Sequence, residues 1–382
     1  MAFRLLHVLP SLDIRSGGPL RLVVDLAERA LAFGLDSEIV GTGSLDLPDC
    51  PLPNERIHWC PAALPGTYAY SPALNRWLRS NLGRFHAVLI HGAWTYAALA
   101  AARECRRRGT PYGVVPHGML EAWAVNGQGI RKAWKKRIYW RLFERQVYHS
   151  ARCILFASRR EQQQSLPVFA LPPRQAVLPV YGVESDVPPV RHPANPVLER
   201  PAQQRWALFL GRLHPKKNLD FLLRAWREAD LTEDWRLIVA GPGEPDYLKL
   251  LKTLVAELEL DARVRFVGLV SGADKAYLLE QAEWFLLPSR QENFAVAVLE
   301  AIAHRCPVAI SDCVGLAESF PPDAEILPLE LPAWVEFLRR RMPDAAWRQR
   351  RLETDRERLL ERFEMNAVAR AWAETLPRVL KE

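Results

Sequence analysis

The stretch from Trp284 to Ser311 reads WFLLPSRQENFAVAVLEAIAHRCPVAIS, and it decides the fold class. Its first four residues, Trp284–Leu287, are apolar and predict a buried strand, which a polar loop from Ser289 to Asn293 follows. We expect a helix from Phe294 to His304 and a second strand from Pro307 to Ile310. A strand, a helix and another strand in this order form the βαβ unit from which parallel sheets are built.

The same alternation continues on both sides of this stretch. A helix is predicted from Leu20 to Phe33, where Gly34 ends it. Further strands are expected at Leu5–Leu9, Ala87–Ile90, Tyr112–Val115, Arg152–Ala157, Trp206–Leu210, Arg236–Ala240 and Val264–Val267. The sequence therefore predicts an α/β fold with parallel sheets along most of its length.

The chain has 382 residues, which is too long for one ordinary hydrophobic core. A proline-rich stretch without periodicity follows residue 183 and predicts a domain boundary. We place a Rossmann-like domain at 1–185, a linker at 186–204 and a second Rossmann-like domain at 205–360. A last helix at 361–382 is expected to cross back to the first domain.

The net charge of +7 and the pI of about 9.2 favour an anionic partner, either a nucleotide, a phospholipid surface or a nucleic acid. The N-terminus lacks the pattern of a signal peptide, and no apolar run is long enough to span a bilayer. The six cysteines show no CxxC spacing, which argues against a structural zinc site or a disulfide framework. A cytoplasmic location with reduced thiols is the expectation.

Polar residues gather where predicted strands end. The segment GRLHPKKN, 211–218, follows a strand and precedes a leucine-rich helix, so Arg212 and Lys217 are expected near the start of that helix. Two cations beside a helix N-terminus suit a diphosphate. The alternative is a pair of solvated surface cations. The chain contains neither a G-x-G-x-x-G nor a Walker A motif, which argues against dinucleotide and P-loop sites.

Two carboxylates flank the helix of the opening stretch. Glu292 stands just before its predicted start, and Glu300 lies within an otherwise apolar run. A helix that is apolar nearly all round is buried, and an unpaired carboxylate there is costly. We therefore expect ligand hydroxyls to be its partners. A buried Glu–Arg pair, or an ordinary acid at a helix start, is the alternative.

These motifs together resemble a known family. The pattern consists of GGP at 17–19, HG at 117–118, GRL-x3-K, AGPG at 240–243, V-x-F-x-G at 264–268 and Glu-x7-Glu. In this order it is similar to glycosyltransferase family 4, and the likeness covers roughly residues 3 to 320. HGMLEAWAV and the basic, Trp-rich stretch after it resemble bacterial members that build exopolysaccharide or O-antigen units.

The resemblance implies a GT-B fold, with two Rossmann-like domains whose parallel sheets face a central cleft. It also implies retaining, metal-independent transfer of a hexose from a nucleotide diphosphate sugar, of the GDP-mannose or UDP-hexose type, to a glycan or lipid-linked acceptor. The sequence has no DxD motif, which agrees with catalysis without a metal or other cofactor.

Roles for single residues follow from the same resemblance. Arg212 and Lys217 would hold the donor diphosphate, Glu300 the ribose hydroxyls and Glu292 the transferred sugar. The catalytic candidates are His117 and Glu292, and the acceptor-side candidates are His91 and Trp94. His7, by contrast, is expected to be a core or edge residue of a strand. The donor-binding candidates are Gly17, Gly18, Arg212, Lys217, Gly241, Gly268, Leu269, Asn293, Phe294, Ala295, Val296 and Glu300.

The chain departs from the family pattern at two places. The family's usual Glu-Gly-Phe-Gly is Glu292-Asn293-Phe294-Ala295 here, and Arg305 stands where glycine is common in the family. A Cβ at position 295 would lie where backbone often approaches the sugar and the phosphate. The departures leave every charged candidate in place, but they leave the identity of the donor sugar open.

A basic, Trp-rich stretch, 131–151, has a helical pattern. Trp134, Ile138, Leu142 and Val147 lie near one face, with Lys and Arg on either side. The preferred interpretation is a domain helix with its apolar face in the core. The second is a helix that contacts an anionic membrane surface, at the inner face of the plasma membrane, where a lipid-linked acceptor would be found.

Two other functions are alternatives. A sugar-nucleotide epimerase on a related scaffold would need no acceptor, and Glu-x7-Glu together with GRL-x3-K argues against it. A non-enzymatic nucleic-acid-binding protein would account for the charge. The chain has no recognisable motif of that class, and its cations coincide with strand ends, so we expect no nucleic-acid partner. The oligomeric state is not indicated.

Overall fold

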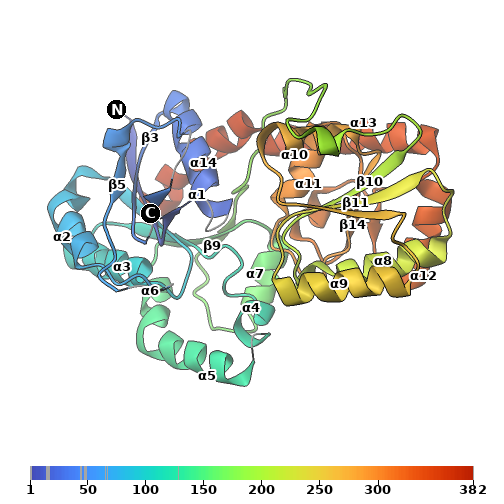
Figure 1. Cartoon of the computed structure of the whole chain (residues 1–382). Coiled ribbons are helices and arrows are strands. Elements are labelled where there is room, and N and C mark those ends of the chain that lie inside the picture. The colour runs from blue at the N-terminus through green and yellow to red at the C-terminus, as the bar shows by residue number, and fades with distance from the viewer. Residues whose placement is uncertain are drawn as a thin grey trace. The chain divides into compact units, whose positions relative to one another are not determined.

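The computed structural model describes residues 2–13, 18–43, 45–46, 50–64, 66, 68–127 and 129–381. The chain forms two compact units (Figure 1): unit 1 is Met1–Gly182 with Met365–Glu382, and unit 2 is Val183–Glu364. Residues 186–204, predicted as a linker, belong to unit 2. There the main-chain N–H of Val190 donates to Glu280, and that of Arg200 donates to Tyr277.

Unit 1 is built on a seven-stranded sheet in the order β5-β3-β1-β6-β7-β8-β9, and all its strand pairs are parallel. The strands are β1 Phe3–Leu9, β3 Leu35–Gly41, β5 Ile57–Trp59, β6 Ala87–His91, β7 Tyr112–Val115, β8 Cys153–Phe156 and β9 Gln175–Val177; β2 Leu12–Asp13 pairs with β4 Leu45–Asp46. Along the chain, the strands are first added on one side of β1, as β3 and then β5. From β6 onward they are added on the other side, so the direction reverses between β1 and β6. Ligands of doubly wound sheets bind at such a reversal, beyond the carboxyl ends of the strands.

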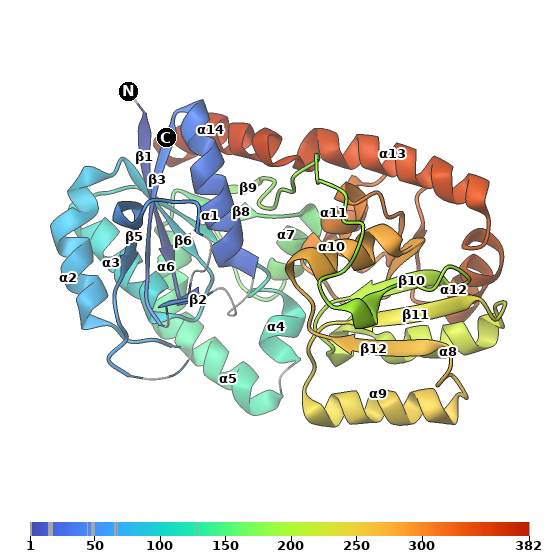
Figure 2. The same ribbon diagram turned by 45° about the horizontal axis from the view of Figure 1, so that its top comes forward.

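Helices cover both faces of this sheet. They are α1 Gly18–Ala30, α2 Pro72–Asn81, α3 Tyr96–Arg108, α4 Ala122–Asn126, α5 Ile130–Tyr139, the π segment η5 Trp140–Glu144, α6 Arg145–His149, α7 Arg159–Ser165 and α14 Met365–Lys381. Side chains alternate between the faces of a strand, so Leu6 and Val8 join the core formed with α2, α3 and α6, whereas Leu9 packs with α1. Helices α1 and α14 lie side by side (Figure 2).

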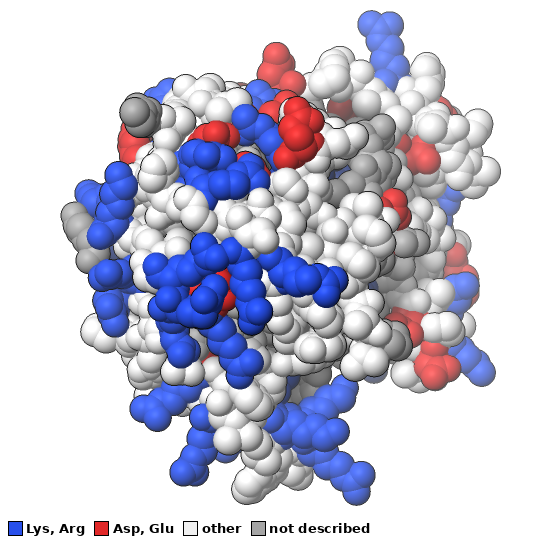
Figure 3. Space-filling model, turned by 90° about the vertical axis from the view of Figure 1, so that its left-hand side faces the viewer, with Lys and Arg blue, Asp and Glu red and all other residues white. Residues whose placement is uncertain are grey.

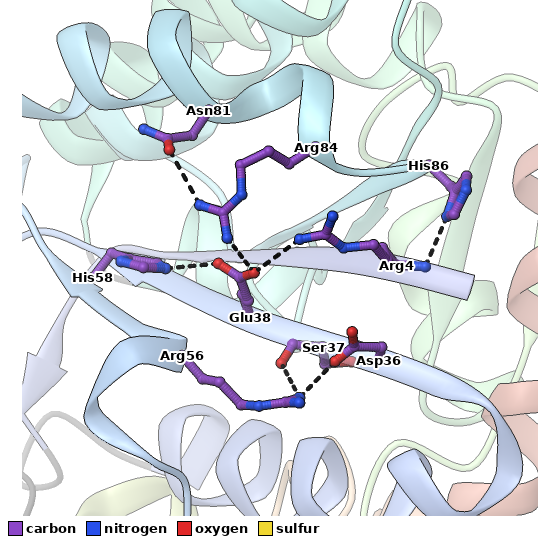
Figure 4. A network of polar contacts seen from close by, with 9 residues as sticks. All are labelled: Arg4, Asp36, Ser37, Glu38, Arg56, His58, Asn81, Arg84 and His86. Atoms are coloured by element: carbon purple, nitrogen blue, oxygen red, sulfur yellow. Dashed lines mark hydrogen bonds and ion pairs between the residues drawn. The ribbon is translucent and has the colours of Figure 1, made fainter. Parts of the chain in front are cut away.

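A buried carboxylate braces one edge of the unit 1 sheet (Figure 4). Glu38 on β3 accepts from Arg4 Nη2 on β1 (3.3 Å) and from Arg84 Nη2 (2.6 Å). Its other oxygen lies 2.8 Å from His58 Nε2 on β5. One acidic side chain therefore ties three neighbouring strands together, which is what a carboxylate needs in order to be buried at low cost.

Unit 2 repeats the plan with six parallel strands in the order β12-β11-β10-β13-β14-β15. The strands are β10 Arg205–Leu210, β11 Trp235–Ala240, β12 Val264–Gly268, β13 Trp284–Leu287, β14 Val308–Ser311 and β15 Ile326–Leu327. The helices are α8 Leu219–Ala229, α9 Pro245–Glu257, α10 Gly272–Gln281, α11 Val296–Ala303, α12 Leu331–Glu336 and α13 Ala345–Phe363. Helices α8 and α9 cover one face, and α10, α11 and α13 cover the other (Figure 1).

The predicted α/β fold with two parallel-sheet domains is confirmed. The strands Tyr112–Val115 and Trp284–Leu287 have the predicted bounds. The helix expected from Phe294 to His304 is shorter, Val296–Ala303, because Ala295 takes a left-handed conformation (φ +73°) that cannot continue a right-handed helix. Among the described residues, no helix combines the length and the apolar character that crossing a bilayer requires.

Candidate active site

The loops that follow β10 and β13 lie next to each other in unit 2, because these two strands are neighbours where the strand order reverses. Arg290 joins the first loop, 211–218, to the second, 289–295. Its main-chain N–H donates to the Lys216 carbonyl (2.8 Å), and its Nε donates to Asn218 Oδ1 (2.7 Å). The two charged motifs of the sequence are therefore parts of one site in unit 2.

Lys217 and Glu292 form an ion pair between these loops, from Nζ to Oε2. Their side chains are 13% and 15% exposed, so solvent screens the contact only partly. The main chain of Glu292 is fixed as well, since its carbonyl accepts from the Gly315 N–H (2.9 Å). A phosphate that approached Lys217 would compete with Glu292 for the ammonium group.

Glu300 is also paired, contrary to expectation. Its Oε1 lies 2.8 Å from Nζ of Lys275 on α10, and its side chain is 29% exposed. The expectation of a fully buried helix was therefore wrong, because one side of α11 reaches solvent. Ligand hydroxyls were expected beside Glu300, and in this structure Lys275 is its partner, which is closest to the alternative of an ion pair with a basic residue. Each of the two predicted carboxylates thus has a lysine partner in the described part of unit 2.

Glycines let three strand ends approach one another closely at this site. Gly241 has φ +131°, and a Cβ there would lie 2.1 Å from the Gly211 carbonyl oxygen, so no larger residue fits. Its N–H donates to the Gly268 carbonyl at 2.6 Å. Leu269 follows with a side chain that is 74% exposed. Gly268 is exposed as well, and because it has no side chain, its main chain is accessible at the edge where the resemblance places the base of the nucleotide.

Ala295 and Arg305, which both stand where the family has glycine, share one backbone feature. Ala295 has φ +73° and Arg305 has φ +60°. Left-handed backbone costs a residue with a Cβ roughly 1 kcal/mol more than it costs glycine. The family's glycines thus match the conformation at both positions, and this chain carries the strain instead.

The remaining donor-side candidates have different surroundings. Arg212 is exposed, and within the described ranges it makes no ion pair. Phe294 is buried against Phe363, with ring centroids 5.3 Å apart. Asn293 and Val296 lie before and at the start of α11. Gly18 is the first residue of α1, whereas Gly17 lies outside the described residues.

His117 stands in unit 1, in the turn that follows β7. Its backbone is left-handed (φ +51°), and the next residue is held by Glu161, whose carboxylate accepts from the N–H groups of Gly118 (2.5 Å) and Ala157 (2.8 Å). Burial raises the pKa of Glu161 to about 7. These bonds fix the turn that aims the His117 ring.

The acceptor-side candidates lie beside this turn. His91 ends β6 and is 1% exposed; its Nδ1 lies 3.0 Å from Nε2 of His117. Trp94 has φ +65°, and its indole N–H donates to the Met119 carbonyl (3.1 Å). Its main-chain N–H donates to Glu144 (3.1 Å), a buried carboxyl whose pKa is raised to about 7 by burial.

The basic helix of unit 1 has an exposed apolar stripe rather than the buried one that we preferred from the sequence. Ile130, Trp134, Ile138 and Leu142 are 79%, 65%, 52% and 63% exposed, and no residue of α5 is buried. Of the four apolar residues grouped in the sequence, only Val147 lies in the core. The preferred interpretation was therefore wrong for α5 and for Leu142 of η5, because an apolar spacing of four fits a surface stripe as well as a core face. Trp140 of η5 does lie in the core.

Lys and Arg side chains surround this stripe. The segment 130–149 carries seven of them and a single Glu, and Figure 3 shows basic side chains gathered over the side with α2 and α3 and toward the bottom, where α5 lies in Figure 1. On α3 and α2, Arg107, Arg108 and Arg79 surround Glu104.

The sequence analysis did not single out three residues that hold the site residues in place. Lys275 and Arg290 act through contacts with distant segments, and no local pattern announces them. Glu161 had a signal, because Ser158-x-x-Glu161 is a capping-box sequence and Ser158 Oγ accepts from the Glu161 N–H (3.0 Å). No group of three or more His, Cys, Asp or Glu in the described ranges is arranged to bind a metal ion.

Two family models match the chain. The model described as glycosyl transferase 4-like domain matches residues 17–181, and the model described as glycosyl transferases group 1 matches residues 192–325. The first match falls in unit 1 and the second in unit 2.

The chain is also similar to curated proteins. O-antigen chain mannosyltransferase B of Escherichia coli is 31% identical over 209 residues, which cover 52% of this chain and 54% of that protein. D-inositol 3-phosphate glycosyltransferase of Kineococcus radiotolerans is 26% identical over 264 residues, which cover 63% of this chain and 60% of that protein. The chain thus spans about half the length of the curated relatives that it matches.

Solved structures share the fold. HepE of Anabaena in complex with UDP and glucose superposes with a TM-score of 0.74 at 15% identity, over 98% of this chain and 99% of that one. A glycosyltransferase from Rickettsia africae gives a TM-score of 0.75 at 16% identity, over 100% and 99% of the two chains. Two sheets of reversing order, two family models that together span most of the chain and these neighbours agree: the chain belongs to the family 4 glycosyltransferases, which have the GT-B fold.

Proposed function

We propose that the protein is a retaining glycosyltransferase, which moves a hexose from a nucleotide diphosphate sugar to a glycan or lipid-linked acceptor. The observation that carries this proposal is the placing of two lysine–carboxylate pairs, Lys217–Glu292 and Lys275–Glu300, on the loops and helices at one site of unit 2. A sugar nucleotide offers a diphosphate and several hydroxyl groups, which call for cations and carboxylates at the same site.

The cations of unit 2 would stabilise the leaving group. Lys217 lies two residues before the first residue of α8, and Arg212 is exposed in the same loop. The diphosphate gains negative charge as the glycosidic bond breaks, so fixed positive charges act most strongly in the transition state. Once a phosphate has taken over Lys217, the carboxylate of Glu292 is free to accept from sugar hydroxyls. Glu300 would accept from the ribose hydroxyls.

The same proposal has the transfer proceed on one face of the sugar, without a metal ion. The leaving phosphate would help to take the proton from the acceptor hydroxyl, and Arg212 and Lys217 would supply the charge that a metal supplies elsewhere. The donor is of the GDP-mannose or UDP-hexose type. A relative named as a mannosyltransferase and a neighbour that holds UDP and glucose support this range of donors.

An assay of the product tests this function. The protein is incubated with GDP-mannose and with UDP-hexoses, with and without membrane glycolipids, and the anomeric signals of fresh product are followed by proton NMR. Retention of the donor's anomeric configuration is the expected result, and an inverted product contradicts the mechanism. Conversion of one sugar nucleotide into another without an acceptor would instead identify an epimerase.

The acceptor would be reached at an anionic membrane surface. Ile130, Trp134 and Ile138 are spaced by four residues and lie on one side of α5, and Lys and Arg flank them. Exposed apolar side chains with a basic surround match the boundary between acyl chains and anionic headgroups. A hollow of about 570 Å³ opens beside the stripe and is lined in part by Arg137, Trp140 and Phe169. The protein would work on the cytoplasmic side of such a membrane.

Co-sedimentation with vesicles tests this contact. Wild type is expected to bind vesicles that contain phosphatidylglycerol and to stay in solution with neutral vesicles. Trp134→Ser combined with Ile138→Ser should lower the bound fraction at least about tenfold, because two exposed apolar anchors are lost. Leu250→Ser is the matched control, because Leu250 is 66% exposed but lies on α9 in unit 2. Equal binding by wild type and the double variant would exclude α5 as the contact.

A further inference from the structure

Three histidines of unit 1 form a hydrogen-bonded row across the sheet. His7 Nδ1 lies 3.0 Å from His91 Nε2, and His91 Nδ1 lies 3.0 Å from His117 Nε2. The row ends at hydroxyl groups, since His7 Nε2 lies 3.3 Å from Ser37 Oγ and His117 Nδ1 lies 3.3 Å from the Tyr181 hydroxyl. Neighbouring rings stack with centroids 5.2 Å apart.

The row follows the strand order. Ser37 belongs to β3, His7 to β1 and His91 to β6, and His117 follows β7; these are successive strands of the sheet. His7 and His91 are each 1% exposed, and Ser37 is fully buried. Trp372 of α14 stacks on His7 at 6.1 Å and covers that end of the row. Only the end with His117 approaches the turn where the family's substrates are expected.

All three rings are neutral at physiological pH. Burial lowers the pKa of His7 to about 3 and that of His117 to about 4. The pKa of His91 is lowered well below its usual value by burial and by the two neighbouring histidines. A neutral imidazole carries one N–H donor and one acceptor nitrogen.

The hydrogen bonds therefore couple the tautomers. If Ser37 donates to His7 Nε2, then His7, His91 and His117 must all carry their proton on Nδ1. In the reverse arrangement His117 donates to His91, His91 to His7 and His7 to Ser37, and all three rings must carry their proton on Nε2. No ring can change its tautomer alone without breaking a bond to its neighbour.

The buried end decides the direction. In the second arrangement Ser37 accepts from His7, and the Ser37 hydroxyl hydrogen would need a further acceptor; among the described residues its hydroxyl has only His7 as a hydrogen-bond partner. A buried donor without an acceptor is unfavourable. In the first arrangement the hydroxyl hydrogen of Ser37 and the N–H of each of the three rings have an acceptor within the row. The same dead end argues against a proton relay, because no described group beyond Ser37 could take a proton on.

We propose that Ser37, His7 and His91 are positioning residues, which hold His117 in the Nδ1–H tautomer. The ring then presents an N–H donor, rather than a base, on the side of Tyr181, where an oxygen of a bound substrate can replace the tyrosine hydroxyl. This inference rests on the proposed function for its effect on transfer. The tautomer itself is a property of the protein without substrate.

Nitrogen NMR on protein with ¹⁵N-labelled histidine tests the tautomer directly. In wild type at pH 7.5, Nδ1 of all three histidines is expected in the range of protonated nitrogen and Nε2 in that of unprotonated nitrogen. Signals are assigned by single substitutions, and His86→Phe is the control, because His86 lies outside the row and accepts from the Arg4 N–H. A His117 that carries its proton on Nε2 overturns the proposal.

Ser37→Ala tests the cause without touching any ring. The loss of this one donor should let His117 sample both tautomers, and kcat should fall about tenfold, the value of one hydrogen bond, with little change in the donor KM. Ser37→Thr, which keeps the hydroxyl, should restore both signals and rate. Unchanged His117 signals in folded Ser37→Ala would mean that the row is only structural.

The two readouts separate this inference from the proposed function. If wild type transfers no sugar but the tautomer shifts in Ser37→Ala as expected, the row stands and the function fails. If transfer is retaining but the tautomer is unaffected, the function stands and the positioning role fails.

Discussion

The two units share a sheet plan but differ in the polar groups at the point where the strand order reverses. In unit 2 these groups are charged, partly exposed and paired across loops, as in Lys217–Glu292. In unit 1 they are three neutral histidines, and two of them are fully buried. Charge near solvent can exchange partners when an anionic ligand arrives. A buried neutral row cannot, and it is suited to fixing one ring in one state.

The largest expected effect comes from removing a cation of unit 2. Lys217→Ala should weaken binding of a nucleoside diphosphate about 100-fold, because a charge-assisted contact is lost and Glu292 remains as a repelling charge. Glu292→Gln should leave diphosphate binding unchanged or tighter, since Lys217 is then not shared. Isothermal calorimetry measures both, with Lys252→Ala on α9 as the control.

If Lys217→Ala and Glu292→Gln weakened diphosphate binding equally, the ion pair would only stabilise the structure of the loops, and Lys217 would not exchange Glu292 for a phosphate. The contrast between an exchangeable pair in unit 2 and a fixed row in unit 1 would then disappear.

The second prediction concerns pH and the histidine row. An unfolded His7 titrates near pH 6.5, whereas burial lowers its pKa to about 3 in the folded protein. The unfolded chain therefore takes up a proton on acidification that the folded chain does not. The stability contributed by neutral His7 is complete above pH 6.5 and falls as the pH drops toward 3.

Urea unfolding of wild type and His7→Phe at pH 6.5 and 4.5 measures this effect. The stability advantage of wild type should shrink by about 2.3 kcal/mol between these two pH values. Each pH unit well below the unfolded pKa costs roughly 1.4 kcal/mol, and at pH 6.5 the unfolded His7 is already half protonated. Trp372→Phe is the control, because it changes the ring that stacks on His7 without removing a titrating group. A constant difference between wild type and His7→Phe would show that His7 does not stay neutral in the fold.

The ion pairs of Glu38 in unit 1 are predicted to contribute to the stability of the fold and not to ligand binding. Glu38→Gln leaves Arg4, Arg84 and His58 facing a neutral amide, and we expect a loss of about 2 kcal/mol in unfolding free energy, less than for a fully buried pair because both arginines are partly exposed. Donor binding should not change. Glu259→Gln, which breaks an exposed pair with Arg227, is the control and should cost little.

The smallest effect is expected at the strained positions of unit 2. Glycine relieves left-handed backbone but costs entropy in the unfolded chain, so Ala295→Gly and Arg305→Gly should each stabilise the protein by at most about 1 kcal/mol. Thermal unfolding measures this, with Ala297→Gly inside α11 as a control that should destabilise. Destabilisation by Ala295→Gly would mean that the methyl group packs usefully at the site.

Much of the fold could be predicted because the buried strands are continuous apolar runs. Tyr112–Val115 and Trp284–Leu287 were predicted with their observed bounds. Short edge strands such as Ile57–Trp59 carry too few residues to show a period, and they were missed. The start of α11 differs from the prediction because it depends on the left-handed Ala295, which the helix propensity of alanine does not indicate.

The sequence indicates several residues of the site, but it does not indicate which of them are in contact. The sequence indicates Lys217, Glu292 and Glu300, yet the Lys275–Glu300 pair joins two helices and has no local signature. The histidine row runs across strands, so its members are separated by 84 and 26 residues and share no spacing. For α5, a spacing of four gave the stripe but not whether it faces the core or solvent.

The central claim is that the charged loops of unit 2 form a donor site that works without a metal ion. Calorimetric titration of UDP-, GDP- and ADP-sugars into wild type and Glu300→Ala, with EDTA present, tests it most directly. We predict that one nucleotide class binds wild type and that Glu300→Ala weakens this binding at least about tenfold, through the lost ribose contacts. If no sugar nucleotide binds the folded wild type under these conditions, or if binding appears only when a divalent ion is added, the account is contradicted.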